Sequence, residues 1–138
     1  MALHSVWAYL AFMFINYIAN AVVLGVPAWR GGLITPGRAA KDLIGYTLLG
    51  QLADAIGLTA GTFLSLPVTR LLGAHGGSFD IIARLCQFVG AGAAIAFLVR
   101  KYLGNRWALP DRTCWGMMAG AAILTNPAIV IALLPEGR

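Results

Sequence analysis

The chain has 138 residues, of which 59% are hydrophobic and only 11% charged, and its formal net charge is +5. Soluble domains carry about 25% charged residues, so this composition, with a mean hydropathy of +0.79, excludes an ordinary soluble protein. It also excludes a nucleic-acid-binding protein, despite a sequence pI near 9.8. We expect an all-helical integral membrane protein with a single domain, residues 1–138, because each membrane span takes about 20 residues.

The first apolar segment runs from about residue 6 to residue 26 and is long enough to cross a bilayer. A signal peptide is the alternative, since Val26-Pro27-Ala28 offers small residues for cleavage. However, residues 1–5 contain no Lys or Arg, and the apolar stretch is longer than that of a usual signal peptide. We therefore expect a first membrane span, with Asn16 and Asn20 as its polar residues.

The second segment covers residues 43–66 and contains Asp54 near its centre. Thr35 and Pro36 favour a helix start just before it, and Pro67 predicts that the helix ends or kinks there. A charged side chain near the bilayer midplane costs about 2.5–3.5 kcal/mol by insertion scales. Asp54 therefore needs either a buried partner or a function.

Small and polar residues share one face of this segment with Asp54. They follow one another by three or four residues, which is the spacing of a helix face. The residues of this face are Thr47, Gly50, Asp54, Gly57, Gly61 and Ser65. We call this face the seam, because small residues allow helices to pack closely. The seam fits a packing surface and the wall of a binding site equally well.

The third segment covers residues 81–99 and the fourth residues 114–134, so we predict four transmembrane helices in a compact bundle. Gly57 and Gly61, like Gly116 and Gly120, form a GxxxG pattern. Both patterns predict that the second and fourth segments can approach closely, either each other or a second copy of the chain.

Basic residues predict the orientation in the membrane. Seven of the ten lie in the segments 27–42 and 100–113, namely Arg30, Arg38, Lys41, Arg100, Lys101, Arg106 and Arg112. By the positive-inside rule, these segments are cytoplasmic loops and both termini lie on the outer, periplasmic or extracellular, side. We expect a bacterial-type inner (plasma) membrane. Four of the cations, Arg100, Lys101, Arg106 and Arg112, are also candidates for binding anionic lipid headgroups, since each is worth about 1 kcal/mol near a membrane surface.

Polar side chains from several segments are predicted to lie at similar depth. The candidate substrate- or ion-binding residues are Asp54, Asn16, Asn20, Asn126 and Gln51. They lead us to expect a small transport or permeation protein for an ion, a proton or a small polar substrate. One alternative is a non-catalytic subunit of a larger membrane complex, in which the amides only hold helices together. The other is a protein that handles a lipid or a lipid carrier.

Signatures of catalysis are missing from the sequence. It contains no paired carboxylates at helical spacing, no HExxH motif and no phosphate-binding loop. The two histidines and two cysteines form no metal-binding pattern, and the sequence identifies no cofactor. The partners we expect are bilayer lipids with their anionic headgroups, and a second copy of the chain or a partner membrane subunit, but no nucleic acid.

Overall fold

The computed structural model describes residues 2–73 and 75–126, which form four helical stretches joined by short connections. The first stretch comprises α1 (Ala2–Asn20), the π-helical turn η1 (Ala21–Gly25) and α2 (Val26–Arg30). The second is α3 (Pro36–Leu71). The third comprises α4 (Gly77–Leu98), the π-helical turn η2 (Val99–Gly104) and α5 (Asn105–Trp107). The fourth is α6 (Asp111–Leu124).

Three of these stretches are long and apolar enough to cross a membrane: Ser5–Arg30, Pro36–Leu71 and Gly77–Trp107. The prediction of a helical membrane protein is confirmed at this level. Helix α6 has 14 residues, fewer than the about 20 that a span requires. The rest of the predicted fourth span, residues 127–134, lies outside the described residues. A compact four-span bundle and the orientation of the termini are therefore not confirmed.

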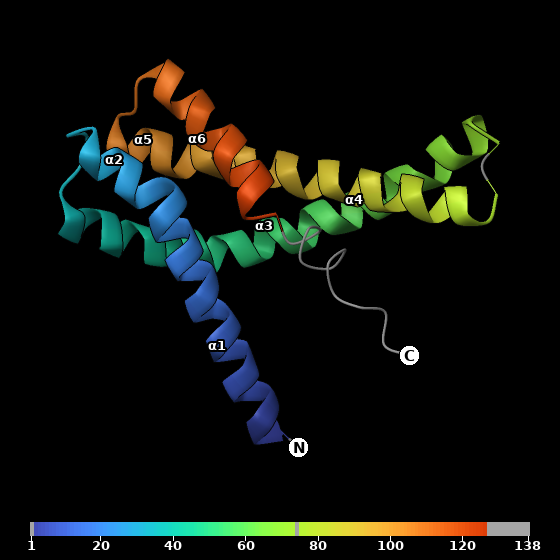
Figure 1. Cartoon of the computed structure of the whole chain (residues 1–138), viewed down its shortest axis with the longest axis horizontal. Helices are drawn as coiled ribbons and strands as arrows, with labels where there is room; N and C mark the ends of the chain where they lie inside the picture. Colours follow the sequence, from blue (N-terminus) through green and yellow to red (C-terminus); the bar gives the residue numbers. More distant parts are fainter. Residues whose placement is uncertain (1, 74, 127–138) are drawn as a thin grey trace.

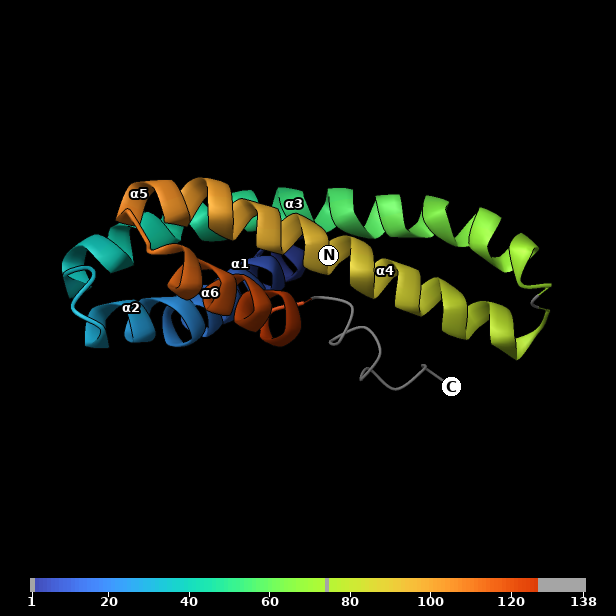
Figure 2. The same ribbon diagram turned by 90° about the horizontal axis from the view of Figure 1, so that it is seen from above.

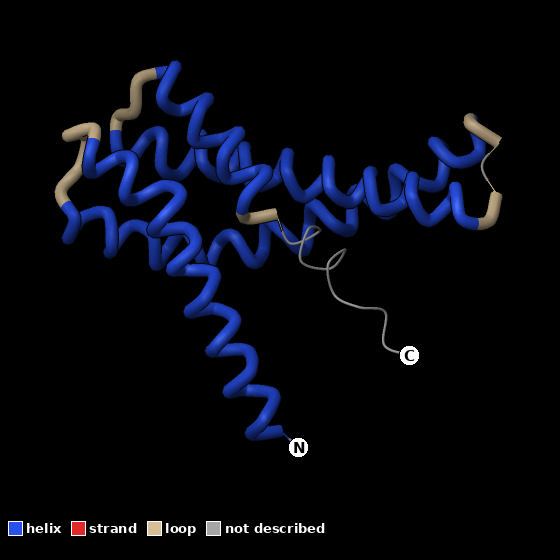
Figure 3. Tube along the Cα trace, in the orientation of Figure 1, coloured by secondary structure: helices blue, strands red, loops and turns tan. Residues whose placement is uncertain are grey.

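The ends of the helices agree only in part with the sequence. Helix α3 begins at Pro36 with Thr35 as its N-cap, as predicted. Of the two outcomes predicted at Pro67, an end or a kink, the helix end is wrong, because α3 continues to Leu71. The two basic segments predicted as loops are mostly helical, and only residues 31–35 and 108–110 connect helices there. Figure 3 shows how short these connections are.

The four stretches meet at one end of the molecule. Figure 1 shows α3 and α4 lying side by side along the long axis, whereas α1 leaves this pair at a steep angle. The view from above in Figure 2 places α2, α5, α6 and the start of α3 at the same end. We call this end the head. The arm is the rest of the α3–α4 pair, residues 50–71 and 77–94.

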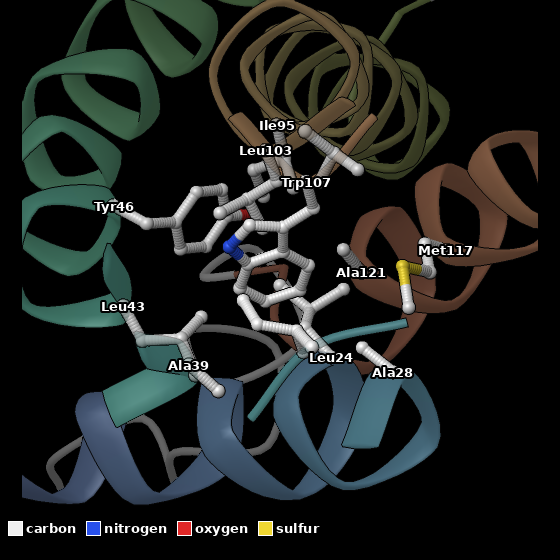
Figure 4. Close-up of a cluster of buried hydrophobic side chains, with 12 residues drawn as sticks. Leu24, Ala28, Ala39, Leu43, Tyr46, Ile95, Leu103, Trp107, Met117 and Ala121 are labelled. Atoms are coloured by element: carbon white, nitrogen blue, oxygen red, sulfur yellow. The ribbon is translucent and has the colours of Figure 1, made fainter. Parts of the chain in front are cut away.

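A hydrophobic core fills the head. Figure 4 shows side chains from α3, from the end of the α4–α5 stretch, from α6 and from the α1–α2 stretch meeting there. The buried residues of this core include Leu24, Ala28, Ala39, Leu43, Tyr46, Ile95, Val99, Leu103, Trp107, Met117 and Ala121. Contacts between distant segments of the chain therefore fix the start of α3 against α5.

The π-helical turn η2 explains the spacing of the core residues on the α4–α5 stretch. Ile95, Val99, Leu103 and Trp107 are all buried and follow one another by four. In an α-helix, which has 3.6 residues per turn, a spacing of four drifts by about 40° at each step. A π turn holds more residues and reverses this drift. The turn η2 lies within this run, so all four side chains keep facing the core.

In the arm, α3 and α4 touch through their backbones. A Cβ atom added to Gly57 would lie 2.6 Å from the carbonyl oxygen of Gly90, and one added to Gly61 would lie 2.6 Å from the Cα of Gln87. The GxxxG pattern of α3 thus faces the third segment, whereas the sequence predicted the fourth segment or a second copy of the chain as its partner. Gly116, in the fourth segment, meets no atom within 4 Å.

The outer surface of the arm is apolar. The large exposed side chains there include Ile56, Phe63, Leu64, Leu85 and Val89. Apart from the half-buried Asp54, the seam residues are buried. Small residues inside and bulky apolar residues outside are the pattern of two helices that pack within lipid.

Candidate functional site

Two of the predicted site residues come together on α3. Asp54 lies one turn after Gln51, and both residues are half-buried. Their Asp54 Oδ1 and Gln51 Nε2 atoms are fully buried and have no hydrogen-bond partner in the part of the chain that the structure describes. A buried polar atom without a partner costs about 1–3 kcal/mol. The two atoms are complementary, because the carboxylate oxygen accepts a hydrogen bond and the amide nitrogen donates one.

Two other polar residues of α3 precede this pair. Tyr46 and Thr47 are buried about two turns before Asp54. Helix α3 thus carries two buried residues with hydroxyl groups, an amide and a carboxylate within little more than two turns.

Asn20 borders this site but is already engaged. Its Nδ2 atom donates a hydrogen bond to Thr47 Oγ1 at 3.0 Å, which ties α1 to α3. Asn16 is half-buried one turn earlier in α1. Its side chain makes no hydrogen bond to any described residue. Of the two asparagines predicted from helix one, Asn20 thus joins α1 to α3. Asn16 makes no contact that places it in the site.

Asn126 follows the end of α6 and contacts α4. It is 1% exposed, and its Nδ2 atom donates to the carbonyl oxygens of Phe88 at 2.9 Å and Ala122 at 3.1 Å. Gly57 faces Gly90, and Gly61 faces Gln87. Extending this antiparallel register places Asp54 level with residues 93–94 of α4. Asn126 binds the backbone of α4 at Phe88, about one and a half turns from that level, and a shared site with Asp54 stays a prediction.

A second buried carboxylate, Asp42, was missed by the sequence prediction. It is 6% exposed and accepts hydrogen bonds from Arg106 Nη1 at 3.0 Å and from Trp107 Nε1 at 2.9 Å. Arg38 Nε lies 3.8 Å from the same carboxylate. The spacing of Arg38 and Asp42, four residues apart, was the only local signal for an ion pair.

Of the cations predicted to bind lipid headgroups, Arg106 belongs to this ion pair. Arg106 also stacks over the ring of Tyr102 at 4.7 Å, and Arg100 lies over Trp115 at 5.7 Å. Lys101 and Arg112 are exposed. Arg106 is thus engaged by the protein itself. Exposed cations beside aromatic rings suit the interface between membrane and water, and binding of headgroups stays a prediction.

Two grooves on the surface of the described residues lie apart from Asp54. One of about 380 Å³ lies on the apolar outside of the arm, between Leu52 and Phe97. Another, of about 140 Å³, lies in the head between Tyr17 of α1 and Leu43 of α3. Asp54 lines neither of these two grooves. In the described part of the chain, no group of three or more His, Cys, Asp or Glu residues could hold a metal ion.

The chain matches no protein family, no curated protein and no solved structure. Its function therefore has to be inferred from the chemistry of these residues and from their surroundings.

Proposed function

We propose that this protein is a small membrane transport or permeation protein, in which Asp54 and Gln51 bind a proton, a small ion or a small polar substrate. The observation that carries the proposal is the pair of buried atoms, Asp54 Oδ1 and Gln51 Nε2, that lack partners among the described residues. A guest that donates to the carboxylate and accepts from the amide offsets the cost of burying both groups.

Other polar side chains of the arm, in contrast, make hydrogen bonds within the protein. Gln87 donates to Thr62 Oγ1 at 3.0 Å, and Thr69 donates to the carbonyl oxygen of Ser65 at 2.7 Å. Such bonds are the ordinary use of polar residues between membrane helices, worth about 0.6 kcal/mol on average. Asp54 Oδ1 and Gln51 Nε2 make no such bond to any described residue.

The test is a flux measurement with purified protein in liposomes. Proton, sodium and potassium fluxes are compared for the wild type, Asp54→Asn and Gln51→Leu. We expect wild-type flux of one of these ions and a loss of at least about tenfold in Asp54→Asn, because a hydrogen bond to a charged group is removed. Asp80→Asn is the matched control, since Asp80 is an exposed acid at the start of α4.

Equal flux in the wild type and in Asp54→Asn contradicts the proposed role of the carboxylate. Absence of proton, sodium and potassium flux from well-folded wild-type protein contradicts transport of these ions. If Asp80→Asn also loses flux, the effect is a general one of charge on the protein. The loss in Asp54→Asn then no longer supports a specific role of Asp54.

The second candidate function is a non-catalytic subunit of a larger membrane complex. One observation favours it: the outer half of α1 stands apart from the head (Figure 1) and exposes large apolar side chains around its circumference. They include Val6, Trp7, Leu10, Phe14 and Ile15. A partner helix could cover this surface. Native mass spectrometry of protein extracted from its own membrane separates the two functions, since an obligate partner together with no flux favours the subunit.

A further inference from the structure

We infer that one phospholipid of the bilayer binds along the α3–α4 pair, with its phosphate on Arg38 and Arg106 and one acyl chain in the groove of about 380 Å³ between these helices. The inference goes beyond the proposed transport function, because its residues are not those of the Asp54 site. It gives Asp42 a second role, which is to hold the two arginines in position for the lipid.

The two arginines share one carboxylate. Arg38 Nε lies 3.8 Å from Asp42 Oδ2, and Arg106 Nη1 donates a hydrogen bond to Asp42 Oδ1 at 3.0 Å. Arg38 Nη2 also donates to the backbone carbonyl oxygen of Arg106 at 2.6 Å. Because one negative charge faces two positive charges, the cluster has a net positive charge.

The two guanidinium groups still have donors that face outward. The Arg38 side chain is 62% exposed and the Arg106 side chain 53% exposed, whereas that of Asp42 is 7% exposed. The bonds above leave Nη1 of Arg38 and Nη2 of Arg106 without a bond to another described residue. Phosphate oxygens fit the planar donor fork of arginine. Side chains that are already held in place lose little entropy on binding, so this pair suits a bound phosphate group.

The place of the pair in the fold indicates the phosphate of a lipid. Arg38 lies in the first turn of the candidate span Pro36–Leu71, and Arg106 lies next to the end of the candidate span Gly77–Trp107. Helix α6 exposes Trp115 in the head, where α5 and the start of α3 also lie (Figure 2). Basic and aromatic residues at the ends of spans are typical of the level of lipid headgroups.

The groove and the arginine pair share one side of the α3–α4 pair. On α3, the spacing of one helix face joins Arg38, Asp42, Gly45, Leu49, Leu52 and Ile56. On the facing stretch, a spacing of four, which η2 keeps on one side as it does for the neighbouring core residues, joins Ala94, Leu98, Tyr102 and Arg106. The last three residues of the first series and the first two of the second line the groove. The groove therefore continues from the arginine pair toward the middle of the two helices.

Tyr102 connects the pair to the groove. Arg106 stacks over its ring at 4.7 Å, and a Cβ atom added to Gly45 would overlap its hydroxyl group. Tyr102 therefore lies against α3 between the level of Asp42 and that of Leu49. The two residue series thus meet on this side of the molecule.

The length of the site matches one leaflet of a bilayer. Leu52 lies about 21 Å along α3 from Arg38, at 1.5 Å per residue. A leaflet with its headgroups is about 20–22 Å thick, half of the full bilayer. A lipid with its phosphate at Arg38 therefore has its acyl chain beside Leu52 and Phe97, which are exposed apolar residues of the groove.

The phosphate position is tested with Arg38→Gln. Delipidated protein in detergent is titrated with phosphatidylglycerol, and bound lipid is measured by native mass spectrometry. We expect one tightly bound lipid per wild-type chain and an affinity at least about fivefold lower in Arg38→Gln, through the loss of one cation. The Arg38 side chain is exposed, so the variant keeps its fold. Arg30→Gln is the matched control, since it removes another exposed cation of the head and should bind like the wild type.

The acyl-chain position is tested with Ala94→Leu, because Ala94 lines the groove and a larger side chain fills part of it. We expect phosphatidylglycerol to bind more weakly, since the lipid buries fewer methylene groups. Ala11→Leu makes the same change at an exposed position of α1 and should leave the affinity unchanged.

Two further ligands distinguish a lipid from its parts. Glycerol 3-phosphate carries the phosphate without acyl chains, and dioleoylglycerol carries the chains without the phosphate. We expect both to bind more weakly than phosphatidylglycerol. If either binds as tightly, the site does not recognise a whole phospholipid and the inference is overturned.

The variants give the other contrary outcomes. Equal affinities of Arg38→Gln and Arg30→Gln for phosphatidylglycerol overturn the phosphate position. An Ala94→Leu protein that binds this lipid as Ala11→Leu does overturns the acyl-chain position. A wild type that binds no phospholipid but forms a dimer through Leu52 and Phe97 would have a second copy of the chain in the groove.

Discussion

Two carboxylates of the same helix are in opposite situations. Asp42 receives hydrogen bonds from Arg106 and Trp107, with Arg38 nearby, and this arrangement fixes α3 to α5. Asp54 Oδ1 has no hydrogen-bond partner among the described residues. The sequence identified Asp54 because a charge in a long apolar run is visible locally. It could not identify the role of Asp42, because the Arg106 and Trp107 partners are 64 and 65 residues away along the chain.

We predict that Asp42→Ala destabilises the protein by about 1–3 kcal/mol, because the buried Trp107 N–H loses its acceptor. Asp42→Asn keeps an acceptor oxygen and costs less. Thermal unfolding in detergent, followed with a thiol-reactive dye that reaches the buried Cys114 on unfolding, measures the change.

Arg38→Ala is the comparison for this prediction. The Arg38 side chain is 62% exposed, and ion pairs of exposed side chains contribute about 0–1 kcal/mol. If Arg38→Ala lowers the unfolding temperature as much as Asp42→Ala does, the Trp107 hydrogen bond is not what stabilises the head.

At the scale of the helices, the sequence predicted the residue ranges of the helices better than their π-helical turns. Residues 6–26, 43–66 and 81–99 all fall within the three long stretches. The turns η1 and η2 could not be predicted, because they depend on which side chains must face the core of the head. Only the period-four spacing of residues such as Ile95 and Val99 hints at them, and that spacing is also compatible with an ordinary helix.

We predict that Gly57→Ala destabilises the arm by about 1–3 kcal/mol, the usual cost of overpacking. The added methyl group would lie 2.6 Å from the carbonyl oxygen of Gly90, so α3 and α4 must separate. The same change at Gly37, which is exposed and has no atom within 4 Å of the added group, leaves stability unchanged or slightly higher. Thermal unfolding of both variants gives the comparison. A Gly57→Ala protein as stable as Gly37→Ala would mean that the arm helices do not touch there.

At the scale of the molecule, the sequence could predict a membrane protein but not the separation into head and arm. Helices that are apolar on every side do not reveal which side faces lipid and which faces protein. The seam could be predicted, because small and polar residues mark it. The direction of α1 relative to the other helices could not. For the same reason Gln51 and Asp54 were predicted together, whereas the engagement of Asn20 with Thr47 required the structure.

Orientation gives a prediction for the whole molecule. Seven of the ten basic residues fall in the segments 27–42 and 100–113, most of which belong to the head. We expect the head on the cytoplasmic side and the tip of the arm outside. In a background with Cys86 and Cys114 replaced by serine, a membrane-impermeant thiol reagent should label Arg112→Cys in inverted vesicles and Gly77→Cys in intact cells. The reverse pattern would invert the topology.

The length of α3 has a consequence for the membrane around it. With 36 residues, the helix is about 54 Å long at 1.5 Å per residue, well beyond the about 30 Å of a bilayer's hydrocarbon core. Such a helix either tilts or extends past the bilayer, and the tilt grows as the bilayer becomes thinner. Because the head fixes α3 to its neighbours, they tilt together. Bilayer thickness, set by the chain length of the lipids, then determines how deep below the membrane surface Asp54 lies.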